Sequence, residues 1–159
     1  MFGMDNDPVV TPALHYRDPK AALEWLERCF GFEVTMAIEG PADAPEMCHY
    51  EMSCSAGRGR IMVGAEWERF TRSPASVAGA NTQTIHVQLA GDVDGHCARA
   101  RAAGAEIVAE PADQFYGDRT YRVVDLEGHR WTFAAHVREV SRADAEAAIG
   151  QPIMATNWQ

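Results

Sequence analysis

The sequence predicts an α+β protein of two tandem βαβββ modules, whose strands form a U-shaped, eight-stranded mixed sheet around a cleft, plus a short C-terminal helix. Alternating polar and apolar runs indicate strands, and two segments with helical spacing each begin at an aspartate and end at a glycine. The same order of elements occurs twice along the chain. We therefore predict modules at 1–65 and 83–136, a linker at 66–82, and a C-terminal helix and tail at 137–159, all in one compact unit.

The first module begins with a strand pattern at residues 9–16. Its alternation separates two faces, Thr11, Ala13 and His15 on one and Val10, Leu14 and Tyr16 on the other. Asp18 followed by Pro19 indicates a helix start, because the carboxylate accepts from free N–H groups and proline has none to lose. Gly31 ends this helix. Three further strand patterns follow at 32–38, 47–54 and 60–65.

The second module repeats this order. A strand pattern at 84–89 precedes Asp92, which caps a helix that Gly104 ends, with Val93, Cys97 and Ala100 facing inward. Strand patterns follow at 105–109, 119–124 and 130–135, and the last two are joined by the turn at 125–128. Ser141 then resembles the cap of a short helix through Ile149, which we expect to pack on the surface or on a partner subunit.

Composition and charge exclude several classes of protein. The 159 residues are 47% hydrophobic and carry a net charge of −9, which disfavours contact with nucleic acid or anionic membranes. No stretch approaches the ~18 apolar residues that span a bilayer, and the N-terminal sequence shows no signal-peptide pattern. The four cysteines form no C-x-x-C pair, so we expect reduced thiols and a cytoplasmic protein.

Two segments in the second module resemble a known superfamily. They are Tyr-Gly-Asp-Arg at 116–119 and Val-Asp-Leu-Glu-Gly-His-Arg-Trp at 124–131, supported by Phe-Gly-Phe at 30–32 in the first module. These are similar to the vicinal-oxygen-chelate superfamily, which contains glyoxalase I, bleomycin-resistance proteins, fosfomycin-resistance enzymes and extradiol dioxygenases. The resemblance covers residues 8–136. It implies paired modules, a cleft that holds a small molecule, and a homodimer.

The metal enzymes of that superfamily use a histidine on the first strand and a glutamate on the last strand of each module. The matching positions here are Thr11 and Thr84 on the first strands, and Val63 or Gly64 and Thr132 on the last strands. Neutral hydroxyl and aliphatic groups cannot replace imidazole and carboxylate ligands at comparable affinity. The chain thus resembles the metal-less, bleomycin-resistance-like branch, and we expect no metal cofactor at the usual position.

Polar and aromatic side chains that should line the cleft form a candidate ligand-binding set. Strand alternation places histidines and an arginine on the cleft face, and a guanidinium fork suits a carboxylate or phosphate, although an ion pair across the hairpin is an alternative role. Three aromatic residues are expected at the cleft mouth, where they could stack on a planar ligand or simply pack a long loop. The set is His15, Thr84, His86, Gln88, Tyr116, Arg122, Trp67 and Phe70.

Three hypotheses about function stay open at this point. The first is a glyoxalase- or bleomycin-resistance-like protein that binds a small aromatic or anionic molecule in its cleft without a conventional metal site. The second is a metal-dependent lyase, isomerase or dioxygenase with relocated ligands or an acid–base pair drawn from His15, His86 and Glu51. The third is a structural or regulatory protein whose cleft is filled by Trp67, Phe70 or the tail. The sequence leaves the choice between binding and catalysis open.

Overall fold

The structure is a computed structural model that describes residues 10–158, and its class and tandem arrangement are as predicted. The first module contains β1 (Ala13–Tyr16), α1 (Pro19–Phe30), β2 (Glu33–Ile38), η1 (Pro45–Met47), β3 (His49–Cys54) and β4 (Gly59–Ala65). The linker contains the short 3-10 helix η2 (Pro74–Ser76). The second module and tail contain β5 (Ile85–Gln88), α2 (Val93–Ala102), β6 (Glu106–Asp113), β7 (Asp118–Val124), β8 (Arg130–His136) and α3 (Arg142–Ile149).

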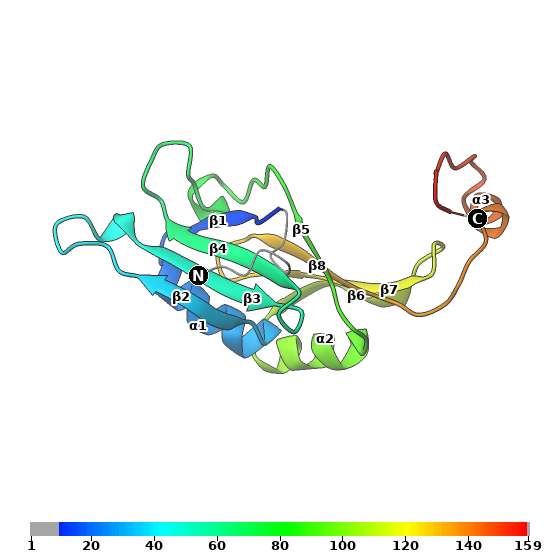
Figure 1. The fold of residues 1–159 in the computed structure, drawn as a ribbon, viewed down its shortest axis with the longest axis horizontal. Coiled ribbons are helices and arrows are strands. Elements are labelled where there is room, and N and C mark those ends of the chain that lie inside the picture. Colours follow the sequence, from blue (N-terminus) through cyan, green and yellow to red (C-terminus); the bar gives the residue numbers. More distant parts are fainter. Residues whose placement is uncertain (1–9, 159) are drawn as a thin grey trace.

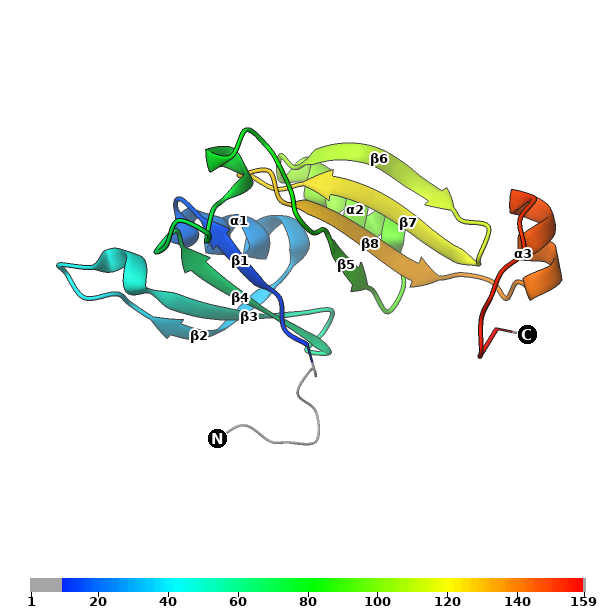
Figure 2. The ribbon, with the colours of Figure 1, turned by 90° about the horizontal axis from the view of Figure 1, so that it is seen from above.

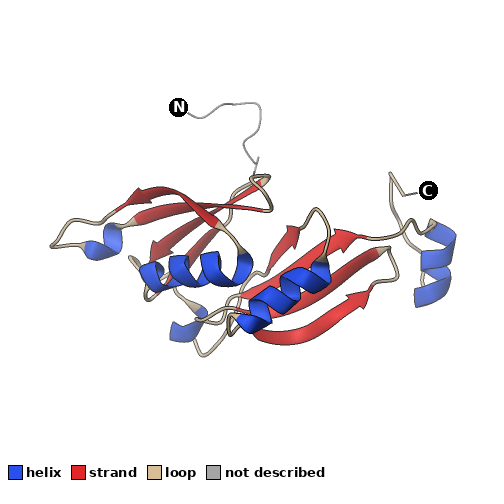
Figure 3. Ribbon diagram, turned by 90° about the horizontal axis from the view of Figure 1, so that it is seen from below, coloured by secondary structure: helices blue, strands red, loops and turns tan. Residues whose placement is uncertain are grey.

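The strands form two sheets of four with the same internal order. Sheet A has the order β1-β4-β3-β2, and sheet B has the order β5-β8-β7-β6. In each sheet the first and last strands of the module pair in parallel, and the other neighbours pair antiparallel. Helices α1 and α2 lie side by side and cover one face of the sheets (Figures 1 and 3). The open face of each sheet therefore lies on the side opposite the helices.

The ends of the two long helices follow from local sequence. Asp18 accepts a hydrogen bond at the N-terminus of α1, and Gly31 ends this helix in the left-handed conformation at φ 70°, which costs glycine least. Asp92 caps α2 in the same way. The C-cap of α2 is Ala103, one residue before the predicted end at Gly104. Gly104 itself has a positive φ of 96°.

Strand β1 is shorter than the sequence pattern suggested. It begins at Ala13, and residue 9 lies outside the described residues. The carbonyl of Pro12 accepts from the Met62 N–H at 2.9 Å. Because β1 is an edge strand, the missing N–H of proline leaves no ladder bond unmade.

Strand β6 is longer than expected, since it continues from Glu106 to Asp113 although Pro111 lies within it. It occupies the other edge of sheet B, where a proline can face away from its single neighbour. The register shifts between Ala109 and Ala112, which accommodates the proline. The expected end at Ala109 was therefore wrong, because only the strand's edge position makes the proline acceptable.

One hydrophobic core joins the two modules. Phe30, at the end of α1, packs edge-on against Phe133 at 4.7 Å and Trp131 at 5.3 Å between ring centroids. Both partners are on β8 and are fully buried, as predicted for Trp131. The modules are therefore not separate bodies joined by a linker, because they share these aromatic contacts.

Module two also holds the N-terminal end of α1. The Glu127 carboxylate accepts from the backbone N–H groups of Arg17 at 2.8 Å and Asp18 at 3.0 Å. Next to it, the Asp125 carboxylate accepts from the Tyr16 hydroxyl at 2.7 Å. Burial raises the pKa of Tyr16, and the charge and hydrogen bond of Asp125 raise it further, so this hydroxyl stays a donor.

Module two holds the C-terminal end of the same helix through α2. Arg99 donates to the carbonyls of Arg28 and Glu27, at 3.4 and 3.2 Å. The Nε2 of His96 donates to the Phe30 carbonyl at 3.1 Å. An acidic group near the start of α1 and a cation at its end both complement the helix dipole.

Helix α3 lies at the far end of module two, apart from the sheets (Figure 2). Ser141 caps it as predicted, since its hydroxyl accepts from the Asp144 N–H at 3.1 Å. The Trp158 indole donates to the Val140 carbonyl, which ties the tail back to the start of this segment. Within residues 10–158, no helix combines the length and apolar character that crossing a membrane requires. The module and linker boundaries stay predictions.

Candidate functional site

Three polar side chains form a row across the open face of sheet B. The strand register places Thr132 on β8 opposite Arg122 on β7 and opposite His86 on β5. Neighbouring strands are about 4.8 Å apart, so the Cα atoms of Arg122 and His86 are separated by roughly 10 Å. Their flanking residues Tyr121 and Val87 point into the core, which leaves the row on the side away from the helices.

Arg122 is the strongest recognition group in this row. Its side chain is exposed, and within residues 10–158 it makes no hydrogen bond and no ion pair. The alternative role of an ion pair across the hairpin is therefore not formed in the described structure. Tyr116 lies in the turn before β7, within range of the Arg122 charge. Burial raises the pKa of Tyr116, Asp118 raises it further, and Arg122 opposes both.

Thr84 and Gln88 extend the same face at either side of His86, and both are exposed. His86 and Gln88 also line a cavity of about 350 Å³ against the β3–β4 turn. Ser55 in that turn donates a hydrogen bond to the Gln88 carbonyl. Five of the predicted ligand-binding residues therefore gather on or beside sheet B, namely Thr84, His86, Gln88, Tyr116 and Arg122.

Glu51 occupies the place on sheet A that Arg122 occupies on sheet B. It pairs with Met62 in register, as Arg122 pairs with Thr132 in sheet B. Although only 7% exposed, its carboxylate contacts Arg60 at 3.2 Å and the His49 imidazole at 3.4 Å. The charge of Glu51 is therefore already compensated within sheet A.

The register also corrects the assignment of one metal-ligand position. Ala13 and His86 are equivalent, because each lies two residues after a matched threonine, Thr11 or Thr84. Ala13 pairs with Met62 in sheet A and His86 pairs with Thr132 in sheet B, so Met62 is the counterpart of Thr132. Val63, one of the two residues assigned from sequence, is fully buried in the core. A thioether is a soft ligand that suits Mg²⁺, Mn²⁺ or Zn²⁺ sites no better than the aliphatic residues did.

The relocated metal set is not assembled in one chain. His15 lies at the junction of the modules, His86 lies on sheet B, and Glu51 is bonded to its neighbours on sheet A. Among residues 10–158, no group of three or more His, Cys, Asp or Glu side chains is placed to hold a metal ion. The donor sets at the usual and at the relocated positions therefore do not fit a divalent metal within this chain.

The other three predicted residues lie elsewhere, around a cavity that we call the junction cavity. It has a volume of about 430 Å³ and lies between β1, the linker and the start of β8. His15 and Phe70 line it, and Trp67 contacts Phe70 edge-on at 5.8 Å. Trp67 and Phe70 are 47% and 73% exposed, so these two rings, which the third hypothesis offered beside the tail, do not fill this cavity.

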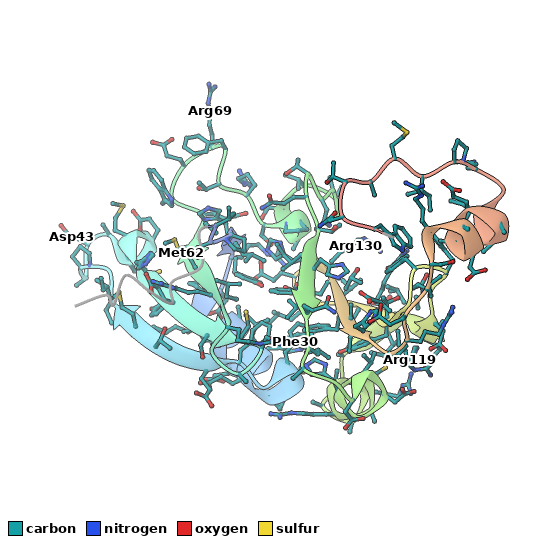
Figure 4. The ribbon with its side chains drawn as sticks, turned by 45° about the vertical axis from the view of Figure 1, so that its right-hand side comes forward. Phe30, Asp43, Met62, Arg69, Arg119 and Arg130 are labelled. Atoms are coloured by element: carbon teal, nitrogen blue, oxygen red, sulfur yellow. The ribbon has the colours of Figure 1, made fainter. Side chains whose placement is uncertain are left out.

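Sequence reasoning missed two residues of the junction cavity, His129 and Arg130. Arg130 begins β8 near the middle of the molecule (Figure 4). The alternation of β8 contained a usable signal, because Trp131 and Phe133 point into the core and Arg130 must therefore face the same side as Thr132. His129 gave no such signal, since it belongs to the turn.

Comparison with known proteins establishes the family. The chain belongs to the glyoxalase/bleomycin resistance protein/dioxygenase superfamily, because the model of that family matches residues 9–133. Among curated proteins, an uncharacterized protein of Mycobacterium bovis, Mb0911c, is 28% identical over 152 residues, which cover 93% of this chain and 96% of that protein.

Solved structures agree with this assignment. TioX from Micromonospora sp. ML1 is 33% identical, with a TM-score of 0.60, and the match covers 84% of this chain and all of TioX. The fosfomycin resistance protein FosX of Listeria monocytogenes, in complex with Mn(II) and sulfate, is 14% identical with a TM-score of 0.58, covering 82% of this chain and 93% of FosX. The likeness to FosX concerns the fold alone.

Proposed function

We propose that this protein binds a small organic molecule on the open face of sheet B, without a metal at the usual position of the superfamily. The observation that carries the proposal is the exposed Arg122 guanidinium, which has no partner within residues 10–158 and stands in a row with Thr132 and His86. An unpaired arginine on a strand face contributes nothing to the core. It suits a ligand that carries a carboxylate or phosphate.

The rest of the face specifies the shape of such a ligand. The roughly 10 Å between Arg122 and His86 matches the length of a molecule with one or two rings. Tyr116 offers an aromatic surface near the arginine, and Thr132 offers a hydroxyl between the two ends. We therefore expect an anionic, planar ligand rather than a sugar or a peptide.

We further propose that a second copy of the chain covers this face, so that the protein acts as a homodimer. The open face of sheet A carries Met36, Ile38 and Met62 in register with polar residues, which is an unusually apolar surface to leave in water. Glu51 is compensated by Arg60 within sheet A, so the apolar side chains rather than charge pairing support this interface. We therefore expect the open face of sheet A in one copy to be buried against sheet B of the other.

The proposal includes a cytoplasmic location and no nucleic-acid or membrane partner. The four cysteines Cys29, Cys48, Cys54 and Cys97 are all unpaired, which supports a reducing compartment. The net charge of −9 supports the absence of polyanionic partners.

The test is a calorimetric titration of the full chain with a panel of aromatic carboxylates, aryl phosphates and antibiotics. For a ligand that binds, Arg122→Gln should weaken the affinity about tenfold or more, because a charge-assisted hydrogen bond of about 1.5–3 kcal/mol is lost. Arg69→Gln is the matched control, since this arginine projects from the linker into solvent (Figure 4). Saturable binding that Arg122→Gln leaves unchanged would contradict the proposal, as would the absence of binding across the panel.

A further inference from the structure

The junction cavity has an unusual charge for this protein. Its lining contains two arginines and two histidines but neither aspartate nor glutamate, in a chain with 23 acidic and 14 basic residues. We infer that the junction cavity is a second binding site, separate from the face of sheet B, and that it takes a small organic anion with an apolar body. This inference does not depend on the proposed function of sheet B.

The cationic groups of the cavity are available to a ligand. The Arg130 guanidinium is exposed and makes no hydrogen bond or ion pair with the described part of the chain. Arg72 uses its Nε to contact Glu66 Oε1 at 3.2 Å, so its two terminal nitrogens stay available. Each guanidinium presents a planar fork of N–H donors that matches two oxygens of a carboxylate or phosphate.

The two imidazoles are oriented by the protein backbone. Nδ1 of His15 donates to the Ala65 carbonyl at 3.0 Å, and Nε2 of His129 donates to the His15 carbonyl at 3.0 Å. A carbonyl can only accept, so these bonds fix which nitrogen carries the hydrogen in each neutral ring. The second nitrogen of each ring makes no hydrogen bond within residues 10–158, and it becomes a donor to an anion when the ring is protonated. Both rings are therefore held in place before anything binds.

The remaining wall of the cavity is apolar. Leu14 and Ile85 contribute from β1 and β5, and Val77 and Phe70 contribute from the linker. The volume of about 430 Å³ lies within the usual range of ligand pockets, ~300–1,000 Å³. An apolar wall opposite a cationic edge suits an amphipathic anion, such as an aryl or branched aliphatic carboxylate.

The linker that forms one side of the cavity is held in place from both ends. The fully buried Ser73 donates from its hydroxyl to Glu127. Further along, the Asn81 amide donates to the Gly128 carbonyl at 2.9 Å and accepts from the Arg130 N–H at 3.3 Å. These bonds fix the linker to the hairpin that carries His129 and Arg130. A wall that is ordered in advance lowers the entropic cost of binding.

The experiment uses 1-naphthoate as the probe, with uncharged 1-naphthamide as its neutral analogue, titrated calorimetrically against the full chain. We expect saturable binding of 1-naphthoate, at least about tenfold weaker binding of the amide, and a loss of about tenfold or more in Arg130→Gln. Phe70→Ala should weaken the binding of 1-naphthoate and leave the affinity for acetate unchanged, because only the aromatic contact is removed. Arg130 and Phe70 are both exposed, so these variants are expected to fold, which a thermal melt checks.

Arg122→Gln is the control that separates the two sites. If Arg122→Gln weakens the binding of 1-naphthoate and Arg130→Gln does not, the inference is wrong and the compound binds at sheet B. If the amide binds as tightly as the acid, the cavity does not select an anion and the inference fails. Binding that depends on Arg130 supports it, and if Arg122→Gln removes a second, separate binding step, sheet B takes 1-naphthoate as well.

Discussion

Replacing Asp125 by asparagine should destabilise the whole protein. The carboxylate is 6% exposed and accepts four hydrogen bonds. Oδ1 takes the backbone N–H groups of Glu127 and His129 at 3.1 and 2.9 Å, and Oδ2 takes the Tyr16 hydroxyl at 2.7 Å and the Trp131 indole at 3.1 Å. An asparagine supplies only one oxygen, so its NH₂ group must face two of these donors. The Tyr16 hydroxyl can rotate to accept, but the Trp131 N–H cannot.

The size of the effect follows from these contacts. One buried donor without an acceptor costs about 1–3 kcal/mol, and the other bonds lose their charge assistance, so Asp125→Asn should cost about 2–4 kcal/mol. For a chain of this length each kcal/mol lowers the Tm by about 2–4 °C, which gives a fall of about 4–16 °C. Thermal and urea unfolding followed by circular dichroism would measure it.

Two controls make the result specific. Asp43→Asn removes an exposed carboxylate in the β2–β3 loop (Figure 4) and should change the stability by less than about 0.5 kcal/mol. Tyr16→Phe combined with Asp125→Asn should cost less than the sum of the single changes, because the two groups share one bond. If Asp125→Asn cost less than about 1 kcal/mol, the buried carboxylate would not hold the modules together as described.

Three further outcomes are expected. Burial lowers the pKa of His96 below its usual ~6.5, so as the pH falls the imidazole is protonated in the unfolded chain before it is protonated in the folded one. The free energy of unfolding should therefore fall as the pH drops below about 6.5. His96→Gln should flatten this dependence in urea titrations between about pH 8 and pH 5. Arg99→Ala should cost about 0.5–1 kcal/mol, less at high salt, because an exposed cation at the C-terminus of α1 is lost; the urea midpoint at two salt concentrations checks this. Ser141→Ala should lower the stability of α3 by about 1 kcal/mol, because the helix loses its N-cap, and hydrogen exchange should become faster in that helix and stay unchanged in the sheets.

Local signals in the sequence were sufficient for most of the fold. Helix α1 begins at the side-chain cap of Asp18 and ends at the left-handed backbone of Gly31, so no distant contact is needed to predict this helix. The alternation of β5 correctly separated exposed His86 from buried Val87, because the period of a strand is set by its pleat. The length of β6 was not readable, since it depends on Pro111 lying at an edge of the finished sheet.

The candidate site was only partly predictable. His15 and His86 were both placed on open strand faces, but the sequence gives no information on how sheet A and sheet B are oriented, and the two residues line different cavities. The contacts of Asp125 and Glu127 with the first module were missed for the same reason, because the donors Tyr16 and Arg17 lie more than 100 residues away in the chain. Pairings of this kind arise only when the modules dock.

The two ends of α1 are completed by side chains from the other half of the chain, so neither half supplies everything that this helix needs. Glu127 and Arg99 bind backbone N–H and C=O groups at the ends of α1, so these contacts depend on where the helix lies and not on which side chains it carries. Substitutions on the exposed face of α1 therefore leave both contacts intact as long as the helix keeps its position against the second module.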